Sequence, residues 1–92
     1  MIGDSERLRP APRNSMGPPS DTRDVQHTGS DKVHVLARLT WPRDRVQVVP
    51  AELVSWADDR ALVRWWPSGR GEPQLTWVPT DDVRRSMRWT SR

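Results

Sequence analysis

The chain of 92 residues contains no cysteine, no phenylalanine and no tyrosine. Without cysteine there is no disulfide framework and no thiolate chemistry, and His27 and His34 alone cannot make a zinc site. No apolar run approaches the roughly 18 residues that a membrane span needs, and the first residues lack the apolar region of a secretory signal. We therefore expect a cytoplasmic protein with no metal and no other cofactor.

Residues with AT-rich codons are almost missing. The chain has fourteen arginines but only one lysine, one isoleucine and one asparagine. This bias indicates a GC-rich genome, such as that of an actinobacterium or one of its phages. Many arginines are then expected from codon usage rather than function, and the six tryptophans are expected to pack where Phe or Tyr would otherwise lie.

The chain also has little net charge, only +3 at pH 7. The charges of residues 1–32 cancel, and residues 33–89 carry nine arginines against seven acidic residues. A dedicated nucleic-acid binder is expected to have a strongly basic patch. The charge balance therefore gives only weak support to nucleic-acid binding.

The first 32 residues contain no apolar run and are rich in Pro, Ser, Thr, Asp and Arg. Such a composition cannot bury enough surface to offset the entropy lost on ordering. It predicts a disordered tail over residues 1–32, followed by one small domain over residues 33–90. Proline-rich pieces such as Arg9–Arg13 favour extended polyproline conformation, which leaves open a role as a ligand for another module.

The clearest strand pattern runs from Val33 to Trp41, where alternate residues from Val33 onward are apolar and share one face. Two shorter strands are predicted at Val46–Val49 and Ala51–Ala57, and a short helix stays open for the second of these. Pro50 lies between them and limits the first to an edge or a strand end.

A hairpin is predicted next, from the apolar runs Ala61–Trp66 and Gln74–Val78 and the turn-forming loop between them. Pro79 ends the second strand, and Thr80-Asp81-Asp82 predicts one helical turn that returns Val83 to the core. Short strands at this spacing predict an all-β fold, either a barrel or a sandwich, and the small size of the domain favours a barrel.

Residues 81–90 allow two structures. A short helix could start at Thr80, with its acidic residues near the positive end and its arginines near the negative end. Alternatively a single turn ends by Arg85, and Ser86–Thr90 forms a closing strand that carries Trp89. We favour the strand, because a small barrel needs one to cover its open edge.

The stretches Trp65-Trp66 and Trp77-Val78-Pro79-Thr80-Asp81-Asp82-Val83 resemble the Src-homology-3-like barrels. That family has a paired Trp-Trp on a strand of the distal hairpin and a later strand that runs into a proline, two polar residues, an aromatic and a valine. The resemblance implies a five-stranded barrel with a binding role. The tyrosines of the proline-peptide groove are missing, and Asp82 replaces the family's aromatic, whereas Tudor-like relatives bind through an aromatic cage that Trp could form.

The tryptophans divide between the two faces of their strands. Trp41 is in phase with the apolar face of its strand and is expected to be buried. Neighbouring residues of a strand point to opposite faces, so Trp65 and Trp66 cannot both face the core. Trp65 belongs to the apolar set, and Trp66 is therefore predicted to be exposed or to line a groove. The resemblance implies that Val78, which precedes Pro79, faces inward, so Trp77 is expected on the outer face, near Trp66.

These positions predict a module that binds a protein partner, with Trp66 and Trp77 as anchors and Arg64 and Arg70 at the rim. One alternative is a nucleic-acid-binding barrel, in which bases stack on tryptophan and arginines contact phosphates. The candidate phosphate contacts are Arg70, Arg84, Arg85 and Arg88. Another alternative is homodimerisation through the same face, so a monomer or weak homodimer is expected.

No catalytic constellation is recognisable in the sequence. Asp58-Asp59 and Asp81-Asp82 are typical turn and cap residues, and no histidine stands in a matching motif. Gly69-Arg70-Gly71 lacks the flanking residues of a phosphate-binding loop. We expect a protein that is not an enzyme.

Overall fold

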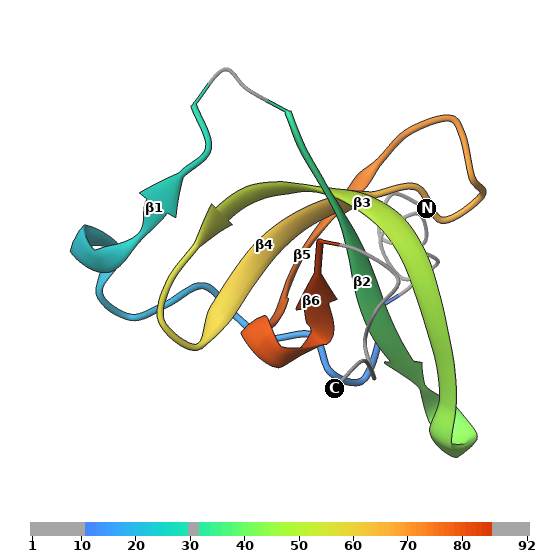
Figure 1. The fold of residues 1–92 in the computed structure, drawn as a ribbon. Coiled ribbons are helices and arrows are strands. Elements are labelled where there is room, and N and C mark those ends of the chain that lie inside the picture. Colours follow the sequence, from blue (N-terminus) through green and yellow to red (C-terminus); the bar gives the residue numbers. More distant parts are fainter. Residues whose placement is uncertain (1–10, 30–31, 86–92) are drawn as a thin grey trace, which may run out of the picture.

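The computed structural model describes residues 11–29 and 32–85 (Figure 1). Its strands are β1 (Gln26–His27), β2 (Val33–Trp41), β3 (Arg45–Trp56), β4 (Arg60–Trp65), β5 (Gln74–Pro79) and β6 (Val83–Arg84). Three short 3-10 turns connect them: η1 (Thr22–Asp24), η2 (Pro42–Asp44) and η3 (Thr80–Asp82). All pairings in these ranges are antiparallel and none of their residues is α-helical, which confirms the all-β prediction. Nor do they include a helix that could cross a membrane.

The strands form one curled sheet in the order β5-β4-β3-β2-β6 (Figure 1). Strand β3 belongs to both halves of this sheet, since residues 45–53 pair with β2 and residues 51–56 pair with β4. Among the described residues β5 and β6 do not pair with each other, so strand pairing alone does not close a barrel.

The core lies inside this curl and follows the predicted alternation. The strand predicted at Val33–Trp41 has the same bounds in β2, and its buried residues are Val35, Ala37 and Leu39. Residues from β3, β4 and β5 complete the core: Val49, Ala51, Val63, Trp65 and Val78. Burial of apolar side chains contributes about 25 cal/mol per Å², so this cluster supplies most of the stability of so small a domain.

Trp65 is the largest residue of this core and is only 2% exposed, as predicted. Its indole Nε1 donates a hydrogen bond to Thr76 Oγ1 at 2.9 Å, which satisfies the one polar atom that the ring takes out of water. Trp41 packs edge-on against it with ring centroids 6.2 Å apart. Trp41 packs against the core as expected, but it is half-buried rather than buried.

Pro50 does not divide two strands, and the prediction of separate strands at 46–49 and 51–57 is wrong. Strand β3 passes through Pro50, which lies opposite Leu36 of β2. The backbone N–H and C=O groups of Leu36 point toward β6, where Leu36 pairs with Arg84. In an antiparallel pair, residues that face each other both point toward or both point away from the partner strand. Pro50 therefore points away from β2, and its missing N–H removes no hydrogen bond from the ladder.

The predicted hairpin and helical turn are both present. Strands β4 and β5 pair in continuous register, Pro79 ends β5, and η3 follows over Thr80–Asp82. Val83 packs against the core and begins β6, which pairs with β2. The closing strand predicted at Ser86–Thr90, with Trp89, lies outside the described residues.

Residues 11–29 were predicted to belong to a disordered tail, but they lie against the sheet. The N–H of Arg13 donates to Thr40 O of β2 at 2.6 Å, and the N–H of Met16 donates to Trp77 O of β5 at 2.7 Å. Pro12 is among the fully buried side chains. We call residues 12–16 the bridging segment, because they join the outer edges of β2 and β5, which do not pair with each other.

The chain after the bridging segment follows the β3–β4 turn. Arg60 donates to the carbonyl of Gly17 at 3.0 Å, and β1 pairs with the last residues of β3. His27 Nδ1 lies 2.7 Å from the hydroxyl of buried Ser55. Residues 11–29 make contacts with four strands, β2, β3, β4 and β5, so the packing of the described residues extends N-terminal to the domain start expected at residue 33.

Candidate binding face

The outer face of the sheet carries a transverse row of side chains near the end of β4. Arg84 of β6 lies opposite Leu36 of β2, and Leu36 lies opposite Pro50 of β3. Trp66 follows Trp65 at the end of β4 and continues this row beyond Pro50, since Trp65 pairs with the next residue of β3. The sheet therefore brings together a cation, two aliphatic residues and an indole from four separate parts of the chain.

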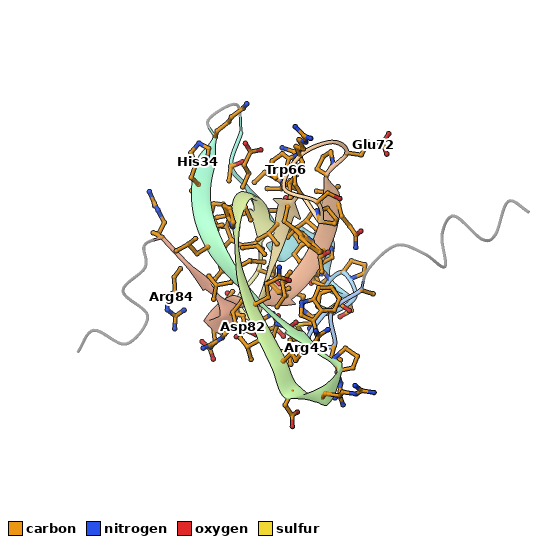
Figure 2. All side chains as sticks on the ribbon, turned by 90° about the vertical axis from the view of Figure 1, so that its right-hand side faces the viewer. His34, Arg45, Trp66, Glu72, Asp82 and Arg84 are labelled. Atoms are coloured by element: carbon orange, nitrogen blue, oxygen red, sulfur yellow. The ribbon has the colours of Figure 1, made fainter. Side chains whose placement is uncertain are left out.

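A groove of about 530 Å³ lies along this part of β3. Its lining includes Val48 and Pro50 of β3, Trp66, Pro67 and Gly69 of the β4–β5 loop, and His34 and Glu52. We call it the Trp66 groove. Figure 2 shows His34 and Trp66 toward one end of the molecule and Arg45 toward the other. As predicted from strand alternation, Trp66 faces away from the core, and it is half-buried.

Two valines extend the apolar surface beyond the groove. Val46 is 59% exposed and Val48 is 44% exposed, and both lie on the outer face of β3. Large aliphatic residues exposed side by side on one strand differ from the scattered ones found on any surface. Together with Pro50 and Trp66 they form a contiguous apolar surface that remains open to solvent in this chain.

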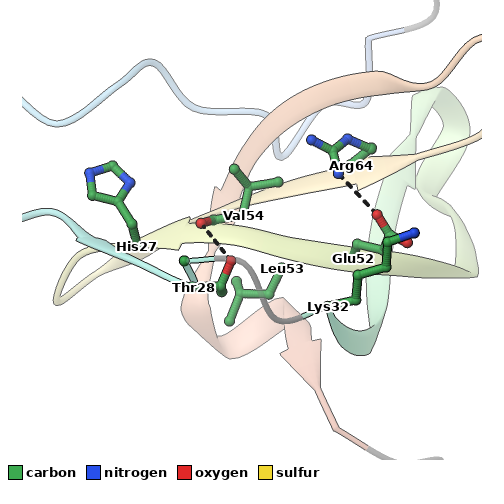
Figure 3. A pocket seen from close by; sticks show the side chains of 8 residues that line it. His27, Thr28, Lys32, Glu52, Leu53, Val54 and Arg64 are labelled. Carbon is green, nitrogen blue, oxygen red and sulfur yellow. Dashed lines mark hydrogen bonds and ion pairs between the residues drawn. The ribbon is translucent and has the colours of Figure 1, made fainter.

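Arg64 lies on the same outer face, in a second transverse row with His34 and Glu52. Its guanidinium forms an ion pair with Glu52 at 3.0 Å. Beside this pair is a smaller hollow of about 350 Å³, whose lining includes His27, Thr28 and Lys32 (Figure 3). The carboxylate of Glu52 neutralises the positive charge of Arg64. Arg64 therefore presents an ion pair, rather than a free cation, to a partner.

Trp77 and Trp66 are not neighbours, and the expectation that they form one platform is wrong. Trp77 pairs with Leu62, whereas Trp66 is four residues further along β4 and its loop. At about 3.3 Å per strand residue this separates the two positions by roughly 13 Å. The Trp77 backbone also pairs with Met16 of the bridging segment. Trp66 is therefore the only predicted anchor that lines the groove.

The remaining candidate arginines are dispersed over the described surface. Arg70 is exposed in the β4–β5 loop between two glycines of positive φ, and Arg85 is exposed after β6. Arg84 is half-buried, and its guanidinium donates to the carbonyl of Val83. Arg88 lies outside the described residues. Of the described candidates, Arg70 lies in the β4–β5 loop and Arg84 and Arg85 lie on and after β6, at opposite ends of the strand order, whereas contacts to a phosphate backbone require a continuous track.

Several other arginines are paired with carboxylates. Arg38 contacts Asp82 at 2.9 Å, and Arg60 contacts Asp59 at 2.9 Å. The hydrogen bond from Arg60 lowers the pKa of Asp59 below its ordinary value. Asp59 therefore stays ionised near neutral pH as the ion-pair partner of Arg60. The described residues also contain no group of three or more His, Cys, Asp or Glu side chains that could hold a metal ion.

The sequence did not single out Val46, Val48 and Pro50 as surface residues, because they lie in a run that reads as apolar core. Their outward orientation follows from how the strand pairs with its neighbours and not from its composition. Once Val49 and Ala51 are placed in the core, the alternate positions Val46, Val48 and Pro50 must face outward.

Comparisons with known proteins give no relative from which a function could be transferred: no family model matches this chain, and neither the curated proteins nor the solved structures include a significant match.

Proposed function

We propose that this protein is a non-catalytic module that binds a protein partner through the Trp66 groove. The observation that carries the proposal is an apolar surface in which Val46, Val48 and Pro50 follow one another along β3 and Trp66 lies beside Pro50, at a groove of about 530 Å³. A partner segment lying there would bury an indole and aliphatic side chains together. Such sites provide most of the binding energy in protein interfaces.

The rim of the groove favours a protein ligand. His34 and Glu52 lie at one end, and Pro67 and Gly69 form part of the wall. Interfaces commonly combine an aromatic and aliphatic centre with a polar rim. Of the predicted rim residues, Arg64 lies near this end as the ion-pair partner of Glu52, and we assign it a supporting role.

We also propose that the sheet is a variant of the Src-homology-3-like barrel suggested by the sequence. A long strand shared between both halves of the sheet, a 3-10 turn after Pro79 and a last strand that returns to β2 support this assignment. In this variant the bridging segment occupies the gap between the edges of β2 and β5. Trp41 and Trp65 pack against each other, and Trp65 is buried, so these two rings do not form an open aromatic cage.

Nucleic-acid binding is less well supported. Arg38, Arg60 and Arg64 are paired with carboxylates, and the other candidates lie on different elements. A protein that neutralises several phosphates needs a track of cations along the backbone of the nucleic acid. An apolar surface at Val46 and Val48 would contribute nothing to such a track.

The test is selection of binding peptides from a random displayed library with the full chain as bait. We expect Trp66→Ala to weaken binding of the selected peptides by roughly 30-fold or more, as for a hot-spot residue. The matched control is Trp77→Ala, which removes the other half-buried outer-face indole and should leave the affinity within about threefold.

A salt series with single- and double-stranded oligonucleotides tests the rival function. Binding that weakens about tenfold or more between about 50 and 200 mM salt, and that Trp66→Ala leaves unchanged, would replace our proposal with nucleic-acid binding. Peptides whose affinity is equally reduced by both Trp variants would contradict the groove as the site.

A further inference from the structure

The ribbon formed by β2 and β3 has one unpaired edge beside the Trp66 groove. Strand β4 pairs with β3 only from Ala51 onward, so residues 45–50 have a partner strand on the β2 side alone. Among the described residues no strand or loop is paired with β3 on the other side of this stretch. An uncovered strand edge is a template for pairing with another chain.

The register fixes which backbone groups this edge presents. In β2 the carbonyl of Arg38 and both backbone groups of Thr40 point away from β3, toward the bridging segment. Their partners in β3, Val48 and Val46, must therefore point away from β2 as well. The free edge thus offers the N–H and C=O groups of Val46 and Val48.

We infer that the partner at this site is a second copy of the chain, joined by antiparallel pairing of β3 with β3. This inference rests on the proposed function and names the partner of the same site. The free groups are self-complementary, because a two-fold axis at Gln47 places Val46 opposite Val48 of the other copy and Val48 opposite its Val46. The N–H and C=O groups of both valines are then satisfied by the same groups of the second copy.

The side chains around this axis are compatible with the pairing. The exposed valines of both copies form one aliphatic cluster on the outer face, which removes their surface from water. Gln47 faces Gln47 at the axis and Arg45 faces Val49, and the pairing ends there because Trp66 already lies opposite Pro50. No like charges are directly opposed, as they would be at an edge designed to repel a second strand.

The limits of the edge explain why the pairing would close as a dimer. Pro50 supplies no N–H at one end, and the chain turns at the other end, where Arg43 and Asp44 both have positive φ. The turn of the second copy would come to lie where β4 ends, next to Trp66 and Pro67. The Trp66 groove is the space into which this turn fits. The interface is short, so we expect a weak dimer that forms at high protein concentration.

Sedimentation of the full chain over a concentration series up to about 1 mM tests the inference. We expect a monomer–dimer equilibrium that Val48→Pro abolishes, since proline removes an N–H from the free edge. Val48→Thr keeps that N–H and should dimerise within about threefold of the original. Leu75→Lys, a charge at an exposed aliphatic residue of β5, should have no effect.

Charge at the axis provides an independent test. Gln47→Lys and Gln47→Glu should each weaken self-association by roughly fivefold, because like charges then face each other, and an equimolar mixture should associate more tightly than either variant alone. The inference would be overturned if Val48→Pro dimerised as tightly as the original chain and if the mixture of the two Gln47 variants associated no more tightly than either variant alone. A monomer at all concentrations would also overturn it, whereas peptides that still bind in a Trp66-dependent manner would leave the proposed function intact.

Discussion

The side-chain amide of Asn14 donates a hydrogen bond to Asp82 Oδ2 at 2.9 Å, although the two residues are 68 positions apart in the chain. The same amide donates to the carbonyl of Arg38, and Asn14 Oδ1 accepts from the N–H of Thr40. One side chain therefore links the bridging segment to β2 and to the η3 turn. Asn14 adds these bonds to the backbone hydrogen bonds of Arg13 and Met16.

Replacing Asn14 with alanine should destabilise the fold by about 1–3 kcal/mol, because several part-buried polar groups lose their partner together. Chemical denaturation gives the change in the free energy of unfolding. Ser15→Ala, one residue along and exposed, is the control and should change the stability by less than about 0.5 kcal/mol. Equal effects of both substitutions would mean that the bridging segment does not stabilise the sheet.

The bond between Trp65 and Thr76 predicts a contrast between two substitutions. Thr76→Val keeps the shape but leaves the buried indole N–H without an acceptor, which should cost about 1–3 kcal/mol. Thr76→Ser keeps the hydroxyl and should cost less than about 1.5 kcal/mol. Thermal or chemical unfolding distinguishes them. If valine were tolerated as well as serine, the hydrogen bond would have no structural role.

The register of β3 predicts that proline is tolerated at alternate positions. The N–H of Gln47 points to β2, so Gln47→Pro breaks a ladder bond and should destabilise by about 3 kcal/mol or more. The N–H of Val48 points to the free edge, so Val48→Pro should cost less than about 1.5 kcal/mol. The same unfolding experiment compares the two variants, and the reverse order would contradict the assignment of the free edge.

The ion pair of Asp59 with Arg60 predicts a pH dependence. The hydrogen bond from Arg60 lowers the folded-state pKa of Asp59 below its ordinary value of 3.8. The stabilisation is therefore fully present well above pH 3.8 and is lost as the pH falls through the lower, folded-state pKa. The difference in unfolding free energy between the original chain and Asp59→Asn should be constant near neutral pH and vanish in acid. A difference that persists at the lowest pH would rule out this pair as its source.

Much of the sheet could be predicted from the sequence, because local patterns determine it. The strand Val33–Trp41, the inward positions of Trp65 and Val78, and the turn at Thr80–Asp82 all follow from alternation and turn chemistry. The prediction that Pro50 separates two strands was wrong, because a proline in the sequence indicates a strand breaker. Only the strand pairing shows that its missing N–H would have pointed away from β2.

The N-terminal segment and the binding face could not be predicted for a different reason. Residues 12–16 are held by hydrogen bonds to distant strands and by the burial of Pro12, and composition contains no trace of these long-range contacts. The separation of Trp66 from Trp77 depends on the register of β4 with β5. The two apolar runs of the predicted hairpin do not by themselves specify how the strands align. Sequence alone did identify Trp66 as an outward-facing ring, because strand alternation is a local rule.

The most direct test of the central claim is an amide NMR dilution series of the full chain, with and without a selected peptide. Our account predicts that concentration changes the resonances of the Val46 and Val48 amides and of the Trp66 indole, and that a bound peptide changes the same signals. The Arg85 amide, which follows β6 at the other end of the strand order, should stay unchanged. A resonance shift at Arg85 alone, seen only on addition of an oligonucleotide, would contradict the Trp66 groove as a protein-binding site.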